Sequence, residues 1–161
     1  MAASTSEPAE AESRLYPSRP FLAASVAVFR DGKVLLATRT KPPSAALFSL
    51  PGGLVEPGET LEEAALRELS EEVGCVAEIA GFVRHSEVIE RDGAGRVLRH
   101  FVIATFAARW VSGEPAPGPE AGAVLFADPA DIGALPTTRG LGDVVDLARR
   151  ALGGADAGAS P

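Results

Sequence analysis

The sequence predicts an α/β domain built around a mixed β-sheet. Apolar segments typical of strands occur on both sides of a helical segment at residues 61–73, and a second helical segment lies near the C-terminus. The length of 161 residues and the 46% of hydrophobic residues suit one domain with a sizeable core. The single cysteine, Cys75, cannot form an internal disulfide or a metal site built from cysteines, and a domain of this size needs neither to fold.

The first two strands should form a β-hairpin, because Asp31-Gly32 is a strong turn signal between two apolar runs. Pro51-Gly52-Gly53 should end the third strand. The expected elements are strands at 21–30, 33–39, 47–50, 76–89, 97–111 and 123–127, helices at 61–73 and 138–152, and loops at 40–46, 90–96 and 112–122. We therefore expect a disordered N-terminal tail at 1–18, a domain at 19–152 and a flexible C-terminal tail at 153–161.

The helix at 61–73 has clear signals at both ends. Thr60 and Glu63 have the spacing of a capping box, in which the Thr60 hydroxyl accepts the Glu63 N–H and Glu63 reaches back. Gly74 stands where a helix C-terminus favours a left-handed residue. Leu66, Leu69 and Val73 form an apolar stripe that should pack on the sheet.

The negative net charge of the chain excludes some classes of binding partner. A net charge of −7 and a pI of about 4.9 argue against binding to nucleic acid polymers or to anionic membranes, since both depend on a positive surface. No apolar run approaches the roughly 20 residues that span a bilayer, and the first 20 residues do not resemble a targeting signal. These features, with the lone cysteine, predict a cytoplasmic protein.

The negative charge is concentrated in residues 53–75, which hold seven glutamates and one arginine. On the predicted helix Glu68, Glu71 and Glu72 fall on one face at i, i+3 and i, i+4 spacing. Like charges at this spacing destabilise a helix unless a cation lies between them, and hard carboxylate oxygens suit Mg²⁺ or Mn²⁺. A solvated acidic face of a purely structural domain is the alternative.

The whole segment resembles the Nudix box, G-x5-E-x7-R-E-U-x-E-E-x-G-U, where U is a bulky aliphatic residue. The matching positions are Gly53, Glu59, Arg67, Glu68, Leu69, Glu71, Glu72 and Gly74. Cys75 departs mildly from the pattern because it fills the last aliphatic position. Leu50-Pro51-Gly52 also resembles the entry into the box. The resemblance is sharpest over 51–75 and extends loosely over 20–152.

This resemblance implies an α/β/α sandwich that hydrolyses a nucleoside diphosphate linked to another moiety, with Mg²⁺ or Mn²⁺ as cofactor. By the same resemblance Glu68, Glu71 and Glu72 would be metal carboxylates, and the Gly52 carbonyl a further ligand. Arg67 would orient the glutamates. Gly53 and Glu59 would complete the surroundings of the cofactor, and Glu59 or Glu63 would pair with Arg67 or brace the loop.

The resemblance places ADP-ribose-type substrates first. A nucleoside triphosphate pyrophosphohydrolase of the 8-oxo-dGTP-cleaving type, or a non-catalytic nucleotide sensor, are the alternatives, and a homodimer is left open. Many relatives carry a further glutamate just before the short strand that follows the variable loop. Glu120 is the nearest acid here and our candidate base, with Glu87 and Glu90 as alternatives.

Overall fold

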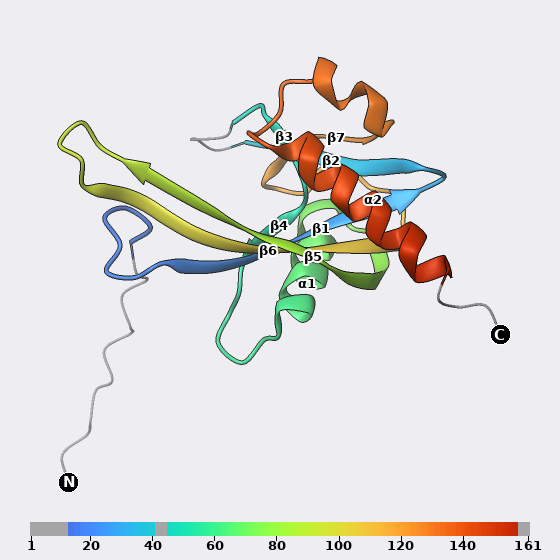
Figure 1. The fold of residues 1–161 in the computed structure, drawn as a ribbon, viewed down its shortest axis with the longest axis horizontal. Coiled ribbons are helices and arrows are strands. Elements are labelled where there is room, and N and C mark those ends of the chain that lie inside the picture. Colours follow the sequence, from blue (N-terminus) through green and yellow to red (C-terminus); the bar gives the residue numbers. More distant parts are fainter. Residues whose placement is uncertain (1–12, 41–44, 158–161) are drawn as a thin grey trace, which may run out of the picture.

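A mixed sheet of seven strands forms the centre of the fold (Figure 1). The structure is a computed structural model that describes residues 13–40 and 45–157. Its elements are β1 (Phe21–Arg30), β2 (Lys33–Arg39), β3 (Phe48–Ser49), β4 (Gly52–Leu54), α1 (Leu61–Val73), β5 (Val76–Arg91), β6 (Val97–Ser112), β7 (Ala121–Ala127), the 3-10 helix η1 (Pro129–Ala134) and α2 (Leu141–Ala157).

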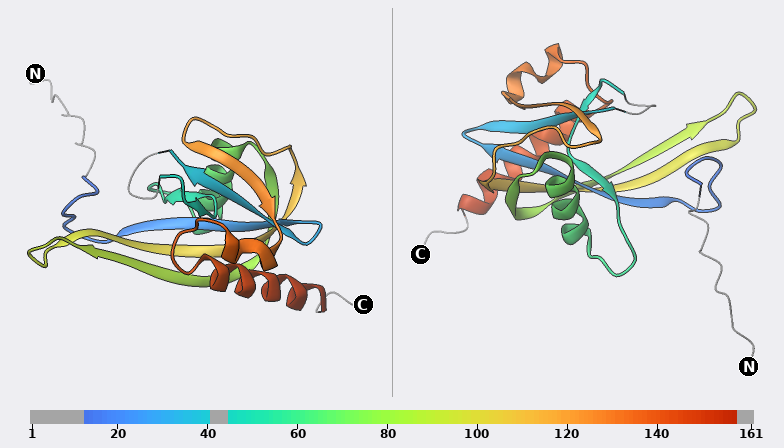
Figure 2. Two further views of the ribbon diagram at one scale, coloured as in Figure 1. Left: turned by 90° about the horizontal axis from the view of Figure 1, so that it is seen from above. Right: turned by 180° about the vertical axis from the view of Figure 1, so that it is seen from behind.

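The strand order is β3-β2-β1-β6-β5, with β4 paired to β1 and β7 paired to β2. β1 and β6 run parallel, while β1 pairs antiparallel with β2 and β4. The sheet is therefore mixed, as predicted. α1 and α2 cover opposite faces of it (Figure 2), which gives the predicted α/β/α arrangement.

Each face of the sheet has its own apolar core because side chains alternate along a strand. On β1, Ala24, Val26 and Val28 pack with α1, while Ala27 and Phe29 pack with α2. All three residues of the first group are fully buried. β1 is thus buried on both faces, which explains its almost continuous apolar sequence.

Several element boundaries differ from the sequence prediction. Gly52–Leu54 forms β4 instead of only ending a strand, because its backbone pairs with Ala23–Ser25 of β1. β7 begins at Ala121, two residues earlier than expected, since its partner strand β2 extends to Arg39. The turn of η1 had no counterpart in the prediction.

The predicted boundaries of the last helix were also wrong. α2 begins at Leu141 because Gly140 has a left-handed φ of 79°, which no helical residue adopts. It continues to Ala157, through the first part of the segment expected to be a flexible tail. Glycine disfavours a helix by about 1 kcal/mol relative to alanine, so Gly153 and Gly154 weaken this last turn without ending it. Residues 158–161 lie outside the described part.

Part of the N-terminal segment that we expected to be disordered is fixed to the β5–β6 hairpin. The Tyr16 backbone N–H donates to the Leu98 carbonyl at 2.9 Å, and the Tyr16 hydroxyl donates to Asp92 at 3.1 Å. The Arg96 guanidinium stacks over the Tyr16 ring, 4.7 Å from its centroid. The tail prediction is therefore wrong for residues 13–18, while residues 1–12 lie outside the described part. Tyr16 takes part in all three of the contacts that fix this segment to the hairpin.

In the part of the chain that the structure describes, no helix is both long enough and apolar enough to cross a membrane.

Both end signals of α1 are confirmed. The Thr60 hydroxyl accepts the Glu63 N–H at 3.1 Å, and the Glu63 carboxylate accepts the Thr60 N–H at 2.8 Å. Gly74 is left-handed, with φ of 73°, and its N–H donates to the Ser70 carbonyl. The helix that carries the acidic cluster is therefore fixed at both ends.

We expect Thr60→Ala to lower the free energy of unfolding by about 1 kcal/mol, because it leaves the Glu63 N–H without its capping acceptor. Urea denaturation monitored by circular dichroism measures this change. Ser112→Ala removes an exposed hydroxyl at the end of β6 and should change the free energy of unfolding little. Equal stability of Thr60→Ala and wild type would contradict a stabilising cap.

Candidate functional site

Two glycines let the loop before α1 approach its neighbours closely. A Cβ atom at Gly52 would lie 2.4 Å from the Ala24 carbonyl oxygen. At Gly53 it would lie 2.4 Å from the Glu68 carboxylate. Since real Cβ atoms do not approach other atoms so closely, any side chain here would push β4 away from β1 or displace Glu68. The glycines thus place the β4 backbone between the sheet and the acidic face of α1.

Arg67 connects this loop to the helix. Its guanidinium donates to both carboxylate oxygens of Glu59, at 2.5 and 3.0 Å, and to the Leu54 carbonyl at 3.1 Å. The same group donates to Glu68 at 3.0 Å and to Glu71 at 3.2 Å. The hydrogen bonds with Glu59 raise the pKa of Arg67 and lower the pKa of Glu59, so both groups stay charged.

Glu59 and Glu63, which the sequence left as alternatives, have separate tasks. Glu59 pairs with Arg67 and also braces the loop, because its carboxylate accepts the Glu56 N–H at 2.9 Å. Glu63 caps α1 instead and makes none of the Arg67 contacts described above. Glu63 is the third residue of the helix, and in a capping box the side chain at this position accepts the N–H of the N-cap residue. Its carboxylate is therefore bound to Thr60 and not to Arg67.

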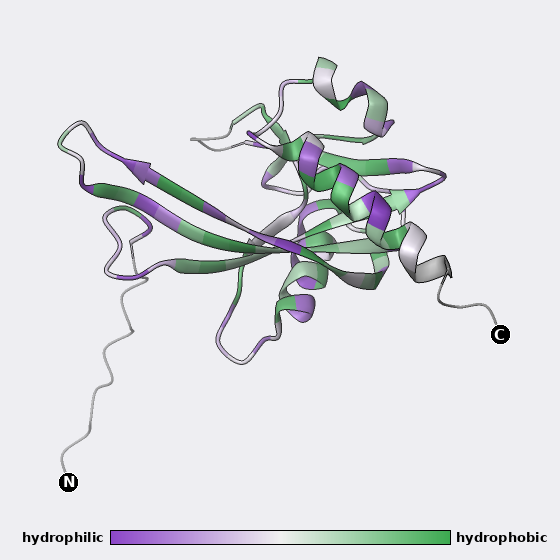
Figure 3. Cartoon of the chain, in the orientation of Figure 1, coloured by the Kyte–Doolittle hydropathy of each residue, from purple (hydrophilic) through white to green (hydrophobic). Residues whose placement is uncertain are grey.

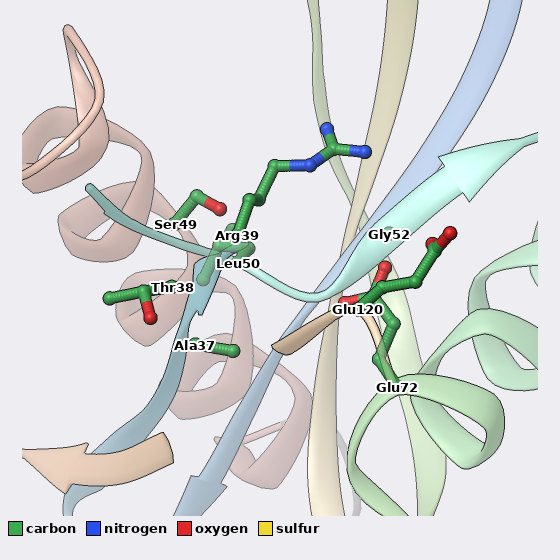
Figure 4. A pocket seen from close by; sticks show the side chains of 8 residues that line it. All are labelled: Ala37, Thr38, Arg39, Ser49, Leu50, Gly52, Glu72 and Glu120. Carbon is green, nitrogen blue, oxygen red and sulfur yellow. The ribbon is translucent and has the colours of Figure 1, made fainter. Parts of the chain in front are cut away.

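A small pocket lies beside this network, between β2, β4 and the C-terminal half of α1 (Figure 4). Its lining residues are Ala37, Thr38, Arg39, Ser49, Leu50, Gly52, Glu72 and Glu120. The enclosed space is about 20 Å³. A space of that size holds roughly one water molecule or ion.

Glu72 is the most perturbed acid of the site. Burial raises its pKa to about 7, and the negative charges of Glu68 and Glu120 add to that shift. The Arg39 charge and a hydrogen bond with the Gly52 backbone oppose it. The carboxylate of Glu72 therefore lies in a negative potential that its neighbours do not neutralise, an environment suited to a cation.

Glu120 immediately precedes β7, because this strand begins at Ala121 and not at Ala123. Its side chain lines the same pocket as Glu72, and Figure 4 shows both side chains extending toward the Gly52 segment. The Glu120 carbonyl also accepts the Thr40 N–H at 3.1 Å. The other two acids considered for a base, Glu87 and Glu90, lie on β5 and do not line this pocket. Glu90 pairs with Arg99 at 2.6 Å.

The structure thus brings the predicted site residues together in two neighbouring groups. Arg67 gathers three carboxylates, those of Glu59, Glu68 and Glu71. Around the pocket lie the others, Gly52, Glu72 and Glu120. Across residues 13–40 and 45–157, no three side chains of histidine, cysteine, aspartate or glutamate converge closely enough to form a ready-made metal site. The ion pairs of Glu68 and Glu71 with Arg67 give a physical reason, since the guanidinium occupies oxygens that a cation would need.

Sequence reasoning missed two polar residues of the pocket, Thr38 and Ser49. Thr38 is buried, and its hydroxyl accepts the Ala123 N–H at 2.8 Å. A threonine near the end of an apolar strand is compatible with ordinary strand packing, so the sequence carried no signal for its place in the pocket.

Several known proteins resemble this chain in sequence and in fold. The family model described as NUDIX domain matches residues 19–146. An ADP-ribose pyrophosphatase of Methanocaldococcus jannaschii is 39% identical over 85 residues, which are 53% of this chain and 50% of that protein. A putative 8-oxo-dGTP diphosphatase 2 of Mycobacterium tuberculosis is 35% identical over 133 residues, 80% of this chain and 89% of that protein.

Among solved structures, a MutT NUDIX hydrolase from Burkholderia pseudomallei superimposes with a TM-score of 0.71. It is 29% identical in sequence, and the match covers 81% of this chain and 98% of that structure. The predicted sandwich is therefore confirmed. The chain spans only half the length of the ADP-ribose pyrophosphatase but most of the other two proteins.

Glu72 should make stability depend on pH in the presence of EDTA. Its folded-state pKa of about 7 exceeds its ordinary value of 4.5, so this group's contribution to stability falls as pH rises through that interval. Glu72→Gln cannot ionise, so its melting temperature should exceed that of wild type at about pH 8 and approach it at about pH 5. Thermal melting across this range measures the difference. The exposed Glu62→Gln should follow wild type, and parallel pH profiles of wild type and Glu72→Gln would contradict the raised pKa.

Proposed function

Because the chain belongs to the Nudix family, whose domain matches residues 19–146, we propose that it hydrolyses the diphosphate bond of a nucleoside diphosphate linked to another moiety. The observation that carries this proposal is the position of Glu72, a largely buried acid beside Glu68 and Glu120. A solvated acidic face of a structural domain would not bury a carboxylate in a negative potential, because burial makes ionisation costly. A site that binds a cation and an anionic substrate explains this arrangement.

The donor atoms fit Mg²⁺ or Mn²⁺. Carboxylates of Glu68 and Glu72, with the Gly52 carbonyl, would hold the cation, and the more exposed Glu71 would approach from the solvent side. All are hard oxygen ligands, which these cations prefer. When bound, a divalent cation would neutralise charge on the diphosphate and favour the ionised form of Glu72.

The remaining residues position the reactants. Arg67 acts as a positioning residue, because it fixes Glu68 and Glu71 against a loop that Glu59 anchors. Arg39 lies at the pocket with an exposed guanidinium, which suits recognition of a phosphate oxygen. Glu120 would accept the proton of the attacking water as general base.

For the substrate, ADP-ribose-type molecules are our first candidate, on the sequence resemblance and on the named relative from Methanocaldococcus. The 8-oxo-dGTP-cleaving activity is the second, favoured by the longer match to the mycobacterial relative. A nucleotide sensor without activity is less consistent with the chain, because every box glutamate is present. The net charge of −7 and the buried free Cys75 support small nucleotides in a reducing compartment such as the cytoplasm.

A substrate screen with product identification tests the proposal. Purified protein with Mg²⁺ or Mn²⁺ is incubated with ADP-ribose, nucleotide sugars, dinucleoside polyphosphates, NADH, canonical nucleoside triphosphates and 8-oxo-dGTP. Water attack on the ADP-ribose bridge yields AMP and ribose 5-phosphate, whereas the second activity yields a nucleoside monophosphate and pyrophosphate. Binding without turnover of any compound would favour the sensor, and neither binding nor turnover would favour a structural domain.

We expect Glu68→Gln and Glu72→Gln each to lower turnover by at least about 100-fold, the scale of losing one electrostatic catalytic group. Glu71→Gln should cost less, because its side chain is 60% exposed whereas that of Glu68 is 16% exposed. Steady-state kinetics at saturating metal measures these effects. Glu62→Gln, an exposed acid in the first turn of the same helix, is the matched control. Near wild-type rates for Glu68→Gln and Glu72→Gln would show that the proposed metal ligands are wrong.

Glu120→Gln should reduce kcat by roughly 10–1000-fold, which overlaps the roughly 100–10,000-fold that general acid–base catalysis usually contributes, with little change in KM. Glu87→Gln and Glu90→Gln, on β5 outside the pocket, should retain activity. The three variants are compared by kcat and KM under one set of conditions. If Glu120→Gln has a normal rate and Glu87→Gln or Glu90→Gln has a reduced one, the general base lies on β5 and not at Glu120.

A further inference from the structure

The loop between β6 and β7 has proline at every second position of one stretch. Residues 115–120, which we call the proline strap, read Pro-Ala-Pro-Gly-Pro-Glu. Proline fixes its φ at about −65° and has no backbone N–H. The strap is therefore stiff, and within it only Ala116, Gly118 and Glu120 have a backbone N–H to donate.

The strap crosses the C-terminal end of α1. The last carbonyl groups of a helix have no hydrogen-bond donor within the helix. Here the Gly118 N–H donates to the Glu72 carbonyl at 2.8 Å, and the Ala116 N–H donates to the Val73 carbonyl at 3.0 Å. The strap thus binds the backbone of Glu72, the same residue whose side chain lines the acidic pocket.

This close approach requires a glycine. A Cβ atom at Gly118 would lie 2.6 Å from the Glu72 carbonyl oxygen and 2.8 Å from the Glu71 carbonyl oxygen, both in the helix backbone. Buried apolar side chains, among them Leu69 and Val73, hold α1 against the sheet, and Figure 3 shows hydrophobic segments alternating with hydrophilic ones along this helix. A larger residue would therefore displace the strap more than the helix.

Two further hydrogen bonds connect Gly118 to Glu120. The Gly118 carbonyl accepts the Ala121 N–H at 3.2 Å, which closes a turn around Glu120. The Glu120 carbonyl accepts the Thr40 N–H at 3.1 Å. From this turn the Glu120 side chain lines the pocket together with Glu72 (Figure 4). Gly118 therefore joins the backbone of Glu72 to the turn that carries Glu120.

The start of the loop is held as well. The Trp110 Nε1–H donates to the Gly113 carbonyl at 2.8 Å, and Arg30 pairs with Glu114 at 2.8 Å. The Arg30 guanidinium also lies over the Trp110 ring, 4.9 Å from its centroid. Because contacts hold the loop on both sides of the strap, the approach of the strap to α1 determines where the following turn lies.

We propose that the proline strap positions Glu120 for catalysis, and that Gly118 is the positioning residue that sets its place through contact with the end of α1. This role rests on the proposed function, because it takes Glu120 as the general base. A base must lie within hydrogen-bond reach of the water that it activates, and a misplacement of about 1 Å can cost roughly 100-fold in rate. Gly118 has no side chain to contact the substrate and acts only through Glu120.

A double-mutant cycle in steady-state kinetics tests this role. Gly118→Ala should lower kcat at least about 10-fold with little change in KM, because it displaces the base. Added to Glu120→Gln, it should cost less than about 2-fold more, since a base that is absent cannot be misplaced. Gly133→Ala, in η1, is the matched control and should keep the wild-type rate, because a Cβ there meets nothing within 4 Å. Melting temperatures show that each variant is folded.

Pro117→Ala is a second variant for the case that Gly118→Ala does not fold. Pro117 is exposed, so its replacement frees φ in the strap without a clash. It should lower kcat roughly 2–5-fold, the scale of restoring the freedom that one proline removes, and only while Glu120 is present. A wild-type kcat in this variant, where Gly118→Ala is unfolded, overturns the role of the strap.

Amide hydrogen exchange measured by NMR tests the geometry without turnover. The Ala116 and Gly118 N–H groups should be protected in wild type and in Gly133→Ala, and should lose protection in Gly118→Ala. Unprotected amides in wild type overturn the strap whatever the kinetics show.

The kinetic outcomes separate the strap from the proposed function. A wild-type kcat in Gly118→Ala, or the same loss with and without Glu120, overturns the role of the strap and leaves the proposed function intact. A normal rate in Glu120→Gln overturns the assigned base and the role of the strap with it. If wild type hydrolyses none of the screened substrates, the proposed function fails, and this role fails with it.

Discussion

The geometry of the site depends on one guanidinium. Arg67 joins three carboxylates and the Leu54 carbonyl, and so connects two turns of α1 to the loop that precedes it. Without this cation Glu68 and Glu71 would repel each other on a single helix face. One positive charge balances only part of the negative charge around it. The excess acts on Glu72, which burial already makes difficult to ionise. The same interaction thus orders the site and leaves it attractive to a cation.

Features of the fold that depend on adjacent residues could be predicted from the sequence. The bounds of α1 followed from its capping box and from Gly74, and the structure has both. The first hairpin followed from Asp31-Gly32, and β1 and β2 have the predicted bounds. In each case the signal and its effect lie within a few residues of one another. No long-range contact is needed to interpret them.

Features that depend on pairing between distant segments could not be predicted in the same way. Gly52–Leu54 is a strand only because β1 lies beside it, and a glycine pair alone indicates a turn. The start of β7, and with it the placement of Glu120 next to Glu72, depends on the register with β2 across more than 80 residues of chain. The Nudix resemblance indicated that an acid belonged in this region. Which of Glu120, Glu87 and Glu90 lies beside Glu72 could be found only from the fold.

The length of β5 and β6 also has a physical meaning. Each strand has 16 residues, but the fully buried apolar side chains of β6 lie near Ala107 and Ala108 in its second half. A two-stranded projection gains little stability by itself, because it has no core to bury its apolar side chains. In this chain β1 and the Tyr16 segment support one side of the projection, and no strand within the described residues pairs with the outer edge of β5. The end of the sheet near α1 therefore holds the acidic pocket, whereas the projecting end leaves Val88 and Ile89 of β5 exposed.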